Sequence, residues 1–149
     1  MPVDATLKTL EKAFKNFGLR MTHQRLEIYR ELACAKDHPS AEAIFRRVQS
    51  RVPTISLDTV YRTLATFEDS GLIARVQVSD DHGRFDGDRS PHHHFICIRC
   101  KSIVDFGWES FDGAELPESA ETWGRVTDKN VVVRGICNSC LNQGRRPKS

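Results

Sequence analysis

Four of the five cysteines form two pairs with the same spacing, Cys97 with Cys100 and Cys137 with Cys140. Two intervening residues let both sulfurs of a pair reach one ion from a tight turn, and two such pairs complete a tetrahedral shell. Four thiolates leave no open position, so the sequence predicts a structural zinc site whose binding energy supports folding. A single pair of this kind also occurs in redox proteins, but two pairs favour zinc over four unrelated buried thiols. Cys34 is expected to be a core residue of a helix.

A histidine tract offers a second, different set of metal ligands. His92 and His94 are two residues apart, so on a strand both imidazoles project to the same face, whereas His93 is expected to point the other way, to the surface. Asp86 precedes the tract and Asp105 lies in the next predicted strand. Imidazole with carboxylate suits Fe(II), Mn(II) or Zn(II). Spacing alone leaves a second interpretation open, in which the histidines are exposed and Asp105 is a satisfied polar group.

Composition limits the class of protein that could carry these sites. The chain has 149 residues, 39% hydrophobic and 28% charged, which is typical of an ordinary globular protein with one large or two small domains. No run of about 18 apolar residues occurs, and the N-terminus has a helical period instead of an apolar signal segment. We therefore expect a cytoplasmic protein, where reduced thiols favour metal binding over disulfides.

The first half of the sequence has the pattern of four helices followed by a hairpin. Apolar residues at helical spacing run from Leu7 to Phe17, and Gly18 ends the run. Three further helices are expected to begin at capping residues, and the fourth to close at Ser70-Gly71; the caps are Thr22, Ser40 and Ser56. Residues 72–78 then read as a strand, 80–83 as a turn and 84–86 as a second extended segment. Such an order predicts a winged helix-turn-helix.

The second half has short strands and a different charge balance. Residues 87–91 form the best boundary, and strands are expected at 95–97, 103–106 and 130–133, with a helix near 110–120. Residues 1–79 carry 12 Lys and Arg against 9 Asp and Glu, a net charge of +3, whereas residues 80–149 carry 10 against 11, a net charge of −1. The fold class is therefore α+β, with the basic half first, a weak indication of nucleic-acid binding.

Several segments, taken in order, resemble the ferric uptake regulator family over about residues 10–142. They are G-L-R-M-T-H-Q-R at 18–25, H-P-S-A at 38–41, S-L-D-T-V-Y-R-T-L at 56–64, R-F-D at 84–86, H-H-H-F-I-C at 92–97 and I-V-D-F at 103–106. The resemblance implies a homodimer, with a winged-helix DNA-binding domain at residues 1–86, a hinge at 87–91 and an α/β dimerisation and metal-binding domain at 92–149.

The same resemblance implies a regulatory Fe(II) or Mn(II) site. Its ligands, carried over by position, would be His38, Asp86, His92, His94 and Asp105. Aspartate at both carboxylate positions is similar to the peroxide-sensing branch of the family, where iron-uptake regulators usually have glutamate. In that branch hydrogen peroxide reacts at the ferrous site, a ligand imidazole (here His38 or His92) is oxidised, and the protein leaves its operator; with Mn(II) this oxidation should not occur. Residues 126–130 lack the histidine of a third metal site seen in some members.

The helix beginning at Ser56 is expected to read the major groove of operator DNA. Thr59, Tyr61 and Arg62 lie away from its apolar face. Candidate contacts to the DNA backbone or minor groove are Lys15, Arg20, Gln24 and Arg25.

We therefore predict a metal-dependent transcriptional repressor and not an enzyme. Three alternatives remain at this stage: an iron- or zinc-responsive repressor without peroxide chemistry, a non-haem iron oxygenase using His92, His94 and Asp105, and a zinc-ribbon adaptor that binds only protein.

Overall fold

A computed structural model describes residues 7–79, 82–88 and 90–143. The chain divides into two compact units, Met1–Arg89 and Ser90–Ser149, and the division falls inside the segment 87–91 predicted as a hinge. Both helices and sheets are present, so the fold class is α+β, as predicted.

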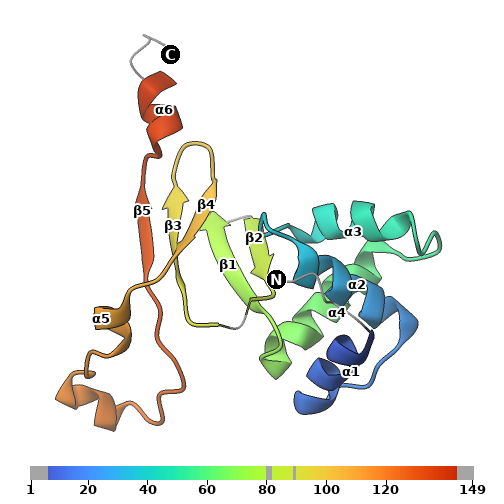
Figure 1. The fold of residues 1–149 in the computed structure, drawn as a ribbon, viewed down its shortest axis with the longest axis horizontal. Helices are drawn as coiled ribbons and strands as arrows, with labels where there is room; N and C mark the ends of the chain where they lie inside the picture. The colour runs from blue at the N-terminus through green and yellow to red at the C-terminus, as the bar shows by residue number, and fades with distance from the viewer. Residues whose placement is uncertain (1–6, 80–81, 89, 144–149) are drawn as a thin grey trace. The chain divides into compact units, whose positions relative to one another are not determined.

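The first unit consists of four helices and a two-stranded sheet (Figure 1). The helices are α1 (Leu7–Asn16), α2 (His23–Cys34), α3 (Ala41–Gln49) and α4 (Leu57–Ser70). The three predicted caps are confirmed: Thr22 accepts from the Arg25 amide at 3.2 Å, Ser40 from the Ala43 amide at 3.1 Å, and Ser56 from the Thr59 amide at 3.0 Å. These bonds satisfy amides that the first turn of each helix leaves without a partner. Gly71 ends α4 with a φ of 89°, a left-handed conformation that glycine adopts without steric cost.

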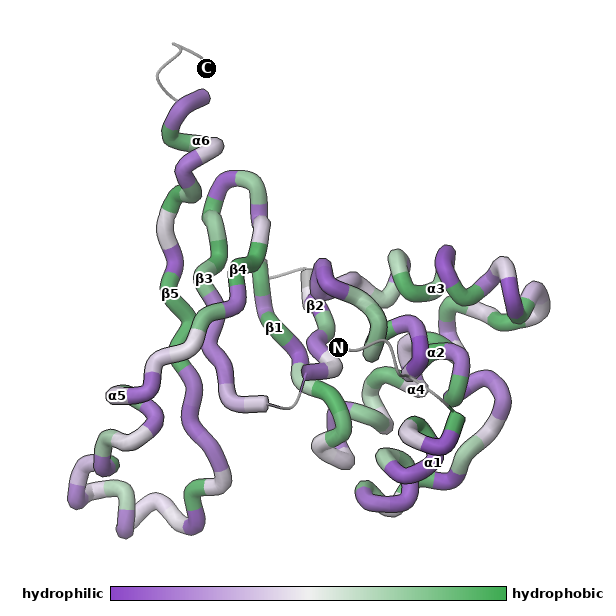
Figure 2. Tube along the Cα trace, viewed as in Figure 1, coloured by the Kyte–Doolittle hydropathy of each residue, from purple (hydrophilic) through white to green (hydrophobic). Residues whose placement is uncertain are grey.

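An apolar core holds the four helices together. Phe14, Tyr29 and Phe67 come from three different helices, and their ring centroids are 5.5 to 5.9 Å apart. Figure 2 shows hydrophobic and hydrophilic stretches alternating along these helices, as expected when one face of each helix is buried. Leu72 and Ile73 were expected to start a strand, but both are buried in this core instead.

The hairpin follows directly. Strand β1 (Ala74–Ser79) pairs antiparallel with β2 (His82–Asp86), with Val76 opposite Arg84. Strand β2 begins at His82, inside the segment 80–83 predicted as a turn, and residues 80 and 81 lie outside the described residues. Helices followed by such a hairpin form the predicted winged helix-turn-helix.

The second unit is built on a three-stranded sheet in the order β4-β3-β5. Strand β3 (His93–Cys97) is central, antiparallel to β4 (Ile103–Phe106) and parallel to β5 (Val132–Gly135). Strand β5 begins two residues later than predicted. A short helix α6 (Asn138–Gln143) begins directly after Cys137 and contains Cys140. It was not predicted, because six residues are too few to show a helical repeat.

The single helix predicted near 110–120 is wrong. Two short helical segments occur instead, α5 (Glu109–Asp112) and the 3₁₀ helix η1 (Glu118–Thr122). Pro117 separates them, because proline disfavours helical geometry at the residue before it. Among the described residues, no helix is long and apolar enough to span a bilayer.

Candidate metal centres and DNA-binding face

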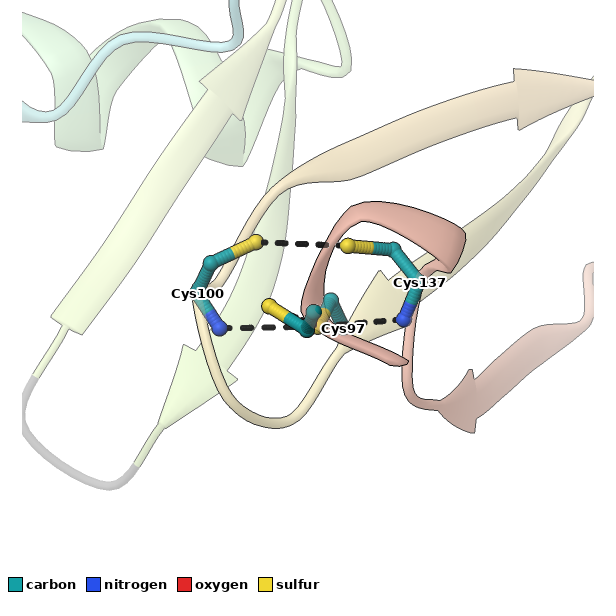
Figure 3. Close-up of side chains that lie close together, drawn as sticks. Cys97, Cys100 and Cys137 are labelled. Carbon is teal, nitrogen blue, oxygen red and sulfur yellow. Dashed lines mark hydrogen bonds between the residues drawn. The ribbon is translucent and has the colours of Figure 1, made fainter. Parts of the chain in front are cut away.

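The four paired cysteines of the second unit meet at one point. Cys97 ends β3 and Cys137 immediately precedes α6 (Figure 3). The Sγ atoms of Cys97 and Cys140 are 3.8 Å apart, those of Cys100 and Cys137 are also 3.8 Å apart, and all four sulfurs lie within 4.8 Å of one another. Zinc–sulfur bonds of about 2.3 Å place tetrahedral sulfurs about 3.8 Å apart. The arrangement therefore fits one tetrahedral zinc ion.

The surroundings of the sulfurs also favour a cation. The backbone amides of Cys100 and Cys137 each donate to Cys97 Sγ at 3.4 Å, and they lower the pKa of Cys97 to about 5. Burial has the opposite effect on Cys140 and raises its pKa to about 12. A bound divalent cation offsets the cost of a buried thiolate and deprotonates the coordinating thiol. Four thiolates so close together need such a charge.

The fifth cysteine contradicts our expectation. Cys34 is the last residue of α2 and is exposed, so it is not a core residue. The helix ends there because Ala35 takes an extended conformation.

A histidine and a carboxylate pair within the first unit. His38 Nε2 lies 3.4 Å from Asp86 Oδ2, and both side chains are buried. His38 is in the turn before α3, and Asp86 ends β2. Spacing alone did not identify His38, because its partner is far away in the sequence and only the family resemblance connects the two.

A similar pair lies within the second unit. His94 Nε2 is 3.3 Å from Asp105 Oδ1, since the two residues are directly opposite each other on β3 and β4. The rings of His92 and His94 are 4.8 Å apart, which confirms that both project to one side. His92 Nδ1 lies 2.7 Å from the Ser90 carbonyl. If that nitrogen carries the proton, Nε2 is the atom available to a metal.

Both pairs have donor atoms suited to the same kind of ion. Each brings an imidazole nitrogen and a carboxylate oxygen to within 3.3–3.4 Å. Ligand bonds of about 2.1 Å separate two donor atoms by about 3.0–3.4 Å, depending on the coordination angle. Nitrogen and oxygen donors without sulfur suit Fe(II), Mn(II) or Zn(II).

The prediction that His93 lies at the surface is wrong. Its side chain is 1% exposed, with Nε2 2.7 Å from Asp112 Oδ1 and Nδ1 accepting from the Val131 amide at 3.0 Å. Its ring also contacts Phe106 and Phe111. Both nitrogens thus have protein partners, and His93 ties β3 to α5 and to the start of β5. The alternation of side chains along a strand correctly places His93 on the opposite side of β3 from His92 and His94. It does not predict that Asp112 and Phe111 cover that side.

Removing the His93 ring should destabilise the second unit. We expect His93→Ala to lower the free energy of unfolding by about 2–4 kcal/mol, because it leaves a cavity and an unpaired Val131 amide. Denaturant unfolding followed by circular dichroism measures this change. His23→Ala, at an exposed position, is the control; equal stability of the two variants would refute the assignment.

The predicted DNA-reading residues lie on the outer side of α4. Tyr61 is 46% exposed, and its hydroxyl donates to a Glu42 carboxylate oxygen, which raises the pKa of Tyr61. Arg62 is exposed and pairs with Asp58 at 3.1 Å. Thr59 is half-buried, and its hydroxyl oxygen accepts from Ser56 at 2.9 Å.

The other predicted DNA contacts differ in accessibility. Lys15 and Arg20 are exposed, whereas Gln24 and Arg25 are half-buried. Arg25 donates to the Arg20 carbonyl at 2.9 Å. Part of its donor capacity is therefore used within the protein.

Comparison with known sequences identifies the protein family. Residues 16–131 match the Ferric uptake regulator family, which is more than half of the chain. The chain belongs to the ferric uptake regulator family.

Relatives within this family are named as regulators. The peroxide operon regulator of Bacillus subtilis is 34% identical over 134 residues, covering 90% of this chain and 92% of that protein. The peroxide-responsive repressor of Staphylococcus epidermidis is 32% identical over 142 residues, covering 95% of each. A solved zinc-bound manganese uptake regulator is 32% identical with a TM-score of 0.62, covering 87% of this chain and 98% of that one. This ferric uptake regulator family member is thus a metal-responsive regulator related to peroxide regulators, and the names agree with our expectation that it is not an enzyme.

Proposed function

We propose that this protein is a homodimeric repressor that binds operator DNA in the cytoplasm when its regulatory metal site is filled. The regulatory ligands would be His38 and Asp86 from the first unit and His92, His94 and Asp105 from the second. A zinc ion held by Cys97, Cys100, Cys137 and Cys140 would stabilise the second unit. The observation that carries the proposal is that each unit contains a histidine–aspartate pair with the same donor atoms at nearly the same separation.

Division of the ligands between the units gives the metal its regulatory role. His38 lies two residues before Ser40, the capping residue of α3, and Asp86 ends the wing strand β2. A ligand set drawn from both units would restrict the pose of the winged helix relative to its dimerisation unit. Metal binding would then raise the affinity for DNA because the metal-bound arrangement of the units is the one that binds the operator more tightly.

Operator DNA would contact the outer side of α4. Tyr61 offers a ring for a thymine methyl group, and Arg62 offers a fork of donors for guanine or phosphate. Thr59, Lys15, Arg20, Gln24 and Arg25 would supply the remaining contacts, mostly to phosphates.

We further propose that the protein senses hydrogen peroxide. Two short carboxylates, Asp86 and Asp105, complete the ligand set, and the two curated relatives reported above are named as peroxide regulators. A bound ferrous ion supplies the chemistry that reduces peroxide and oxidises a neighbouring imidazole. His38 and His92 are the proposed targets. An oxidised imidazole is a poorer ligand, so the protein would lose its metal and release the operator.

Operator binding and mass spectrometry together test this function. We expect Mn(II) and Fe(II) to support tight, salt-dependent operator binding, and a stoichiometric dose of peroxide to abolish it only for the Fe(II) form. The inactivated protein should carry one added oxygen on a peptide containing His38 or His92. Tyr61→Ala is the control, since it should bind metal normally but not DNA. An Fe(II) protein that stays unmodified and on DNA after peroxide would exclude sensing.

The same titration addresses the second candidate, an iron- or zinc-responsive repressor without peroxide chemistry. One of the similar structures is a zinc-bound manganese uptake regulator, and this likeness supports the second candidate. It predicts that peroxide leaves operator binding unchanged and that affinity follows metal concentration alone.

A further inference from the structure

Three consecutive residues of β2 hold the turn that carries His38. Arg84 Nε donates to the His38 carbonyl at 2.6 Å, and its Nη2 donates to the Asp37 carbonyl at 3.3 Å. The Phe85 amide donates to the Pro39 carbonyl at 3.0 Å. Asp86 then faces the His38 ring. Every residue of the turn from Asp37 to Pro39 is therefore bound from the same strand.

The turn needs this support because its backbone is strained. His38 has a φ of 49°, in the left-handed region that residues with a Cβ seldom adopt. Such a conformation persists only where surrounding contacts outweigh its cost. Arg84 provides the shortest of the bonds from β2 to this turn, and a hydrogen bond from a charged guanidinium is stronger than one between neutral groups. From α3, Arg47 holds the other side of the turn through Asp37, with Nη2 2.6 Å from Oδ2.

We propose that Arg84 is a positioning residue for the regulatory metal site. It is not a ligand itself, but it orients the ligand His38 by holding the backbone of that residue. This inference rests on the proposed function, because it assumes that His38 binds the ion. The backbone conformation of His38 sets the direction in which its side chain leaves the main chain. The ring must face Asp86 for the two residues to bind the same ion. Without Arg84, His38 can relax to an ordinary φ, and the Nε2–Oδ2 distance is no longer fixed in the metal-free protein. Metal binding must then reorder the turn and is weakened.

Calorimetric titration of the zinc-loaded full chain with Mn(II) tests the role of Arg84. We expect Arg84→Gln to weaken Mn(II) binding by about 10- to 100-fold, the usual effect of removing a residue that orients a ligand. Arg84→Lys keeps the charge and one donor, so its loss should be smaller. Arg75→Gln is the matched control: Arg75 lies on the paired strand, bonds Glu68 at 3.2 Å and stacks on Phe85, but does not touch the turn. Zinc content should stay at one ion per chain in all variants.

The outcomes separate the inference from the function on which it rests. A general loss of stability would lower the unfolding temperature but leave the Mn(II) affinity of the folded protein unchanged, and that result would overturn the inference. Wild-type affinity in Arg84→Gln, with affinity lost in His38→Ala, would also overturn it while leaving the proposed function intact. Wild-type affinity in His38→Ala would refute the proposed function itself. If Arg84→Gln does not fold, Arg84→Lys decides the question by the same criteria.

Discussion

Replacing Cys97 with serine is expected to remove zinc and unfold the second unit. Cys97 Sγ is buried, accepts two backbone hydrogen bonds and lies 3.8 Å from Cys140 Sγ. Structural zinc sites contribute about 10–16 kcal/mol of apparent binding energy, which is as large as the whole stability of a typical domain, about 5–15 kcal/mol. The second unit has a sheet of three short strands, and so small a core cannot make up for the loss of the zinc binding energy.

Native mass spectrometry and circular dichroism measure the two effects. Cys97→Ser should contain no zinc and should lose the secondary structure of the second unit. Cys34→Ser is the control, because Cys34 is exposed and outside the cluster, so zinc content and circular dichroism should stay as in the wild type. A folded Cys97→Ser protein without zinc would mean that the metal is not structural.

Replacing His94 with alanine is expected to abolish metal-dependent operator binding. Loss of a residue that only hydrogen-bonds a metal ligand weakens metal binding about 10- to 100-fold. Loss of a proposed ligand such as His94 should therefore weaken Mn(II) binding by about 100-fold or more. Asp105, directly opposite on β4, would also lose its 3.3 Å partner. Gel-shift titration at fixed Mn(II) should give the affinity of the metal-free protein, with zinc content unchanged.

Glu118→Gln, an exposed change in the same unit, serves as the control for this variant and should bind the operator normally. If His94→Ala kept full Mn(II)-dependent affinity, the regulatory ligands would have to be sought elsewhere in the chain.

Local chemistry explains which parts of the fold could be predicted. Thr22, Ser40 and Ser56 each cap a helix through a bond to an amide three residues later, so the signal lies within one turn of sequence. Each cysteine pair is also recognised from a short stretch of sequence. The two pairs together predict one zinc site even though they lie far apart along the chain.

Features that depend on packing between elements were missed. His93 was expected at the surface because alternation gives a side of the strand, but Asp112 and Phe111 of α5 cover that side. The segment around Pro117 has helical composition, yet the proline breaks it into two pieces. The bonds from Arg84 to the His38 turn join residues that no spacing rule connects. The contacts that decide the positions of His93 and His38 are therefore long-range, whereas the effect of Pro117 is local.

We propose that one ion requires ligands from both units, and a titration of single and double variants with Mn(II) distinguishes one shared site from two separate sites. Mn(II) affinity would be measured for the wild type, His38→Ala, His94→Ala and the double variant, all loaded with zinc. We predict one Mn(II) per wild-type chain, a severe loss in each single variant, and little additional loss in the double variant, because ligands of one site are not independent. Two Mn(II) ions per chain, or losses of binding free energy that simply add, would refute a shared site.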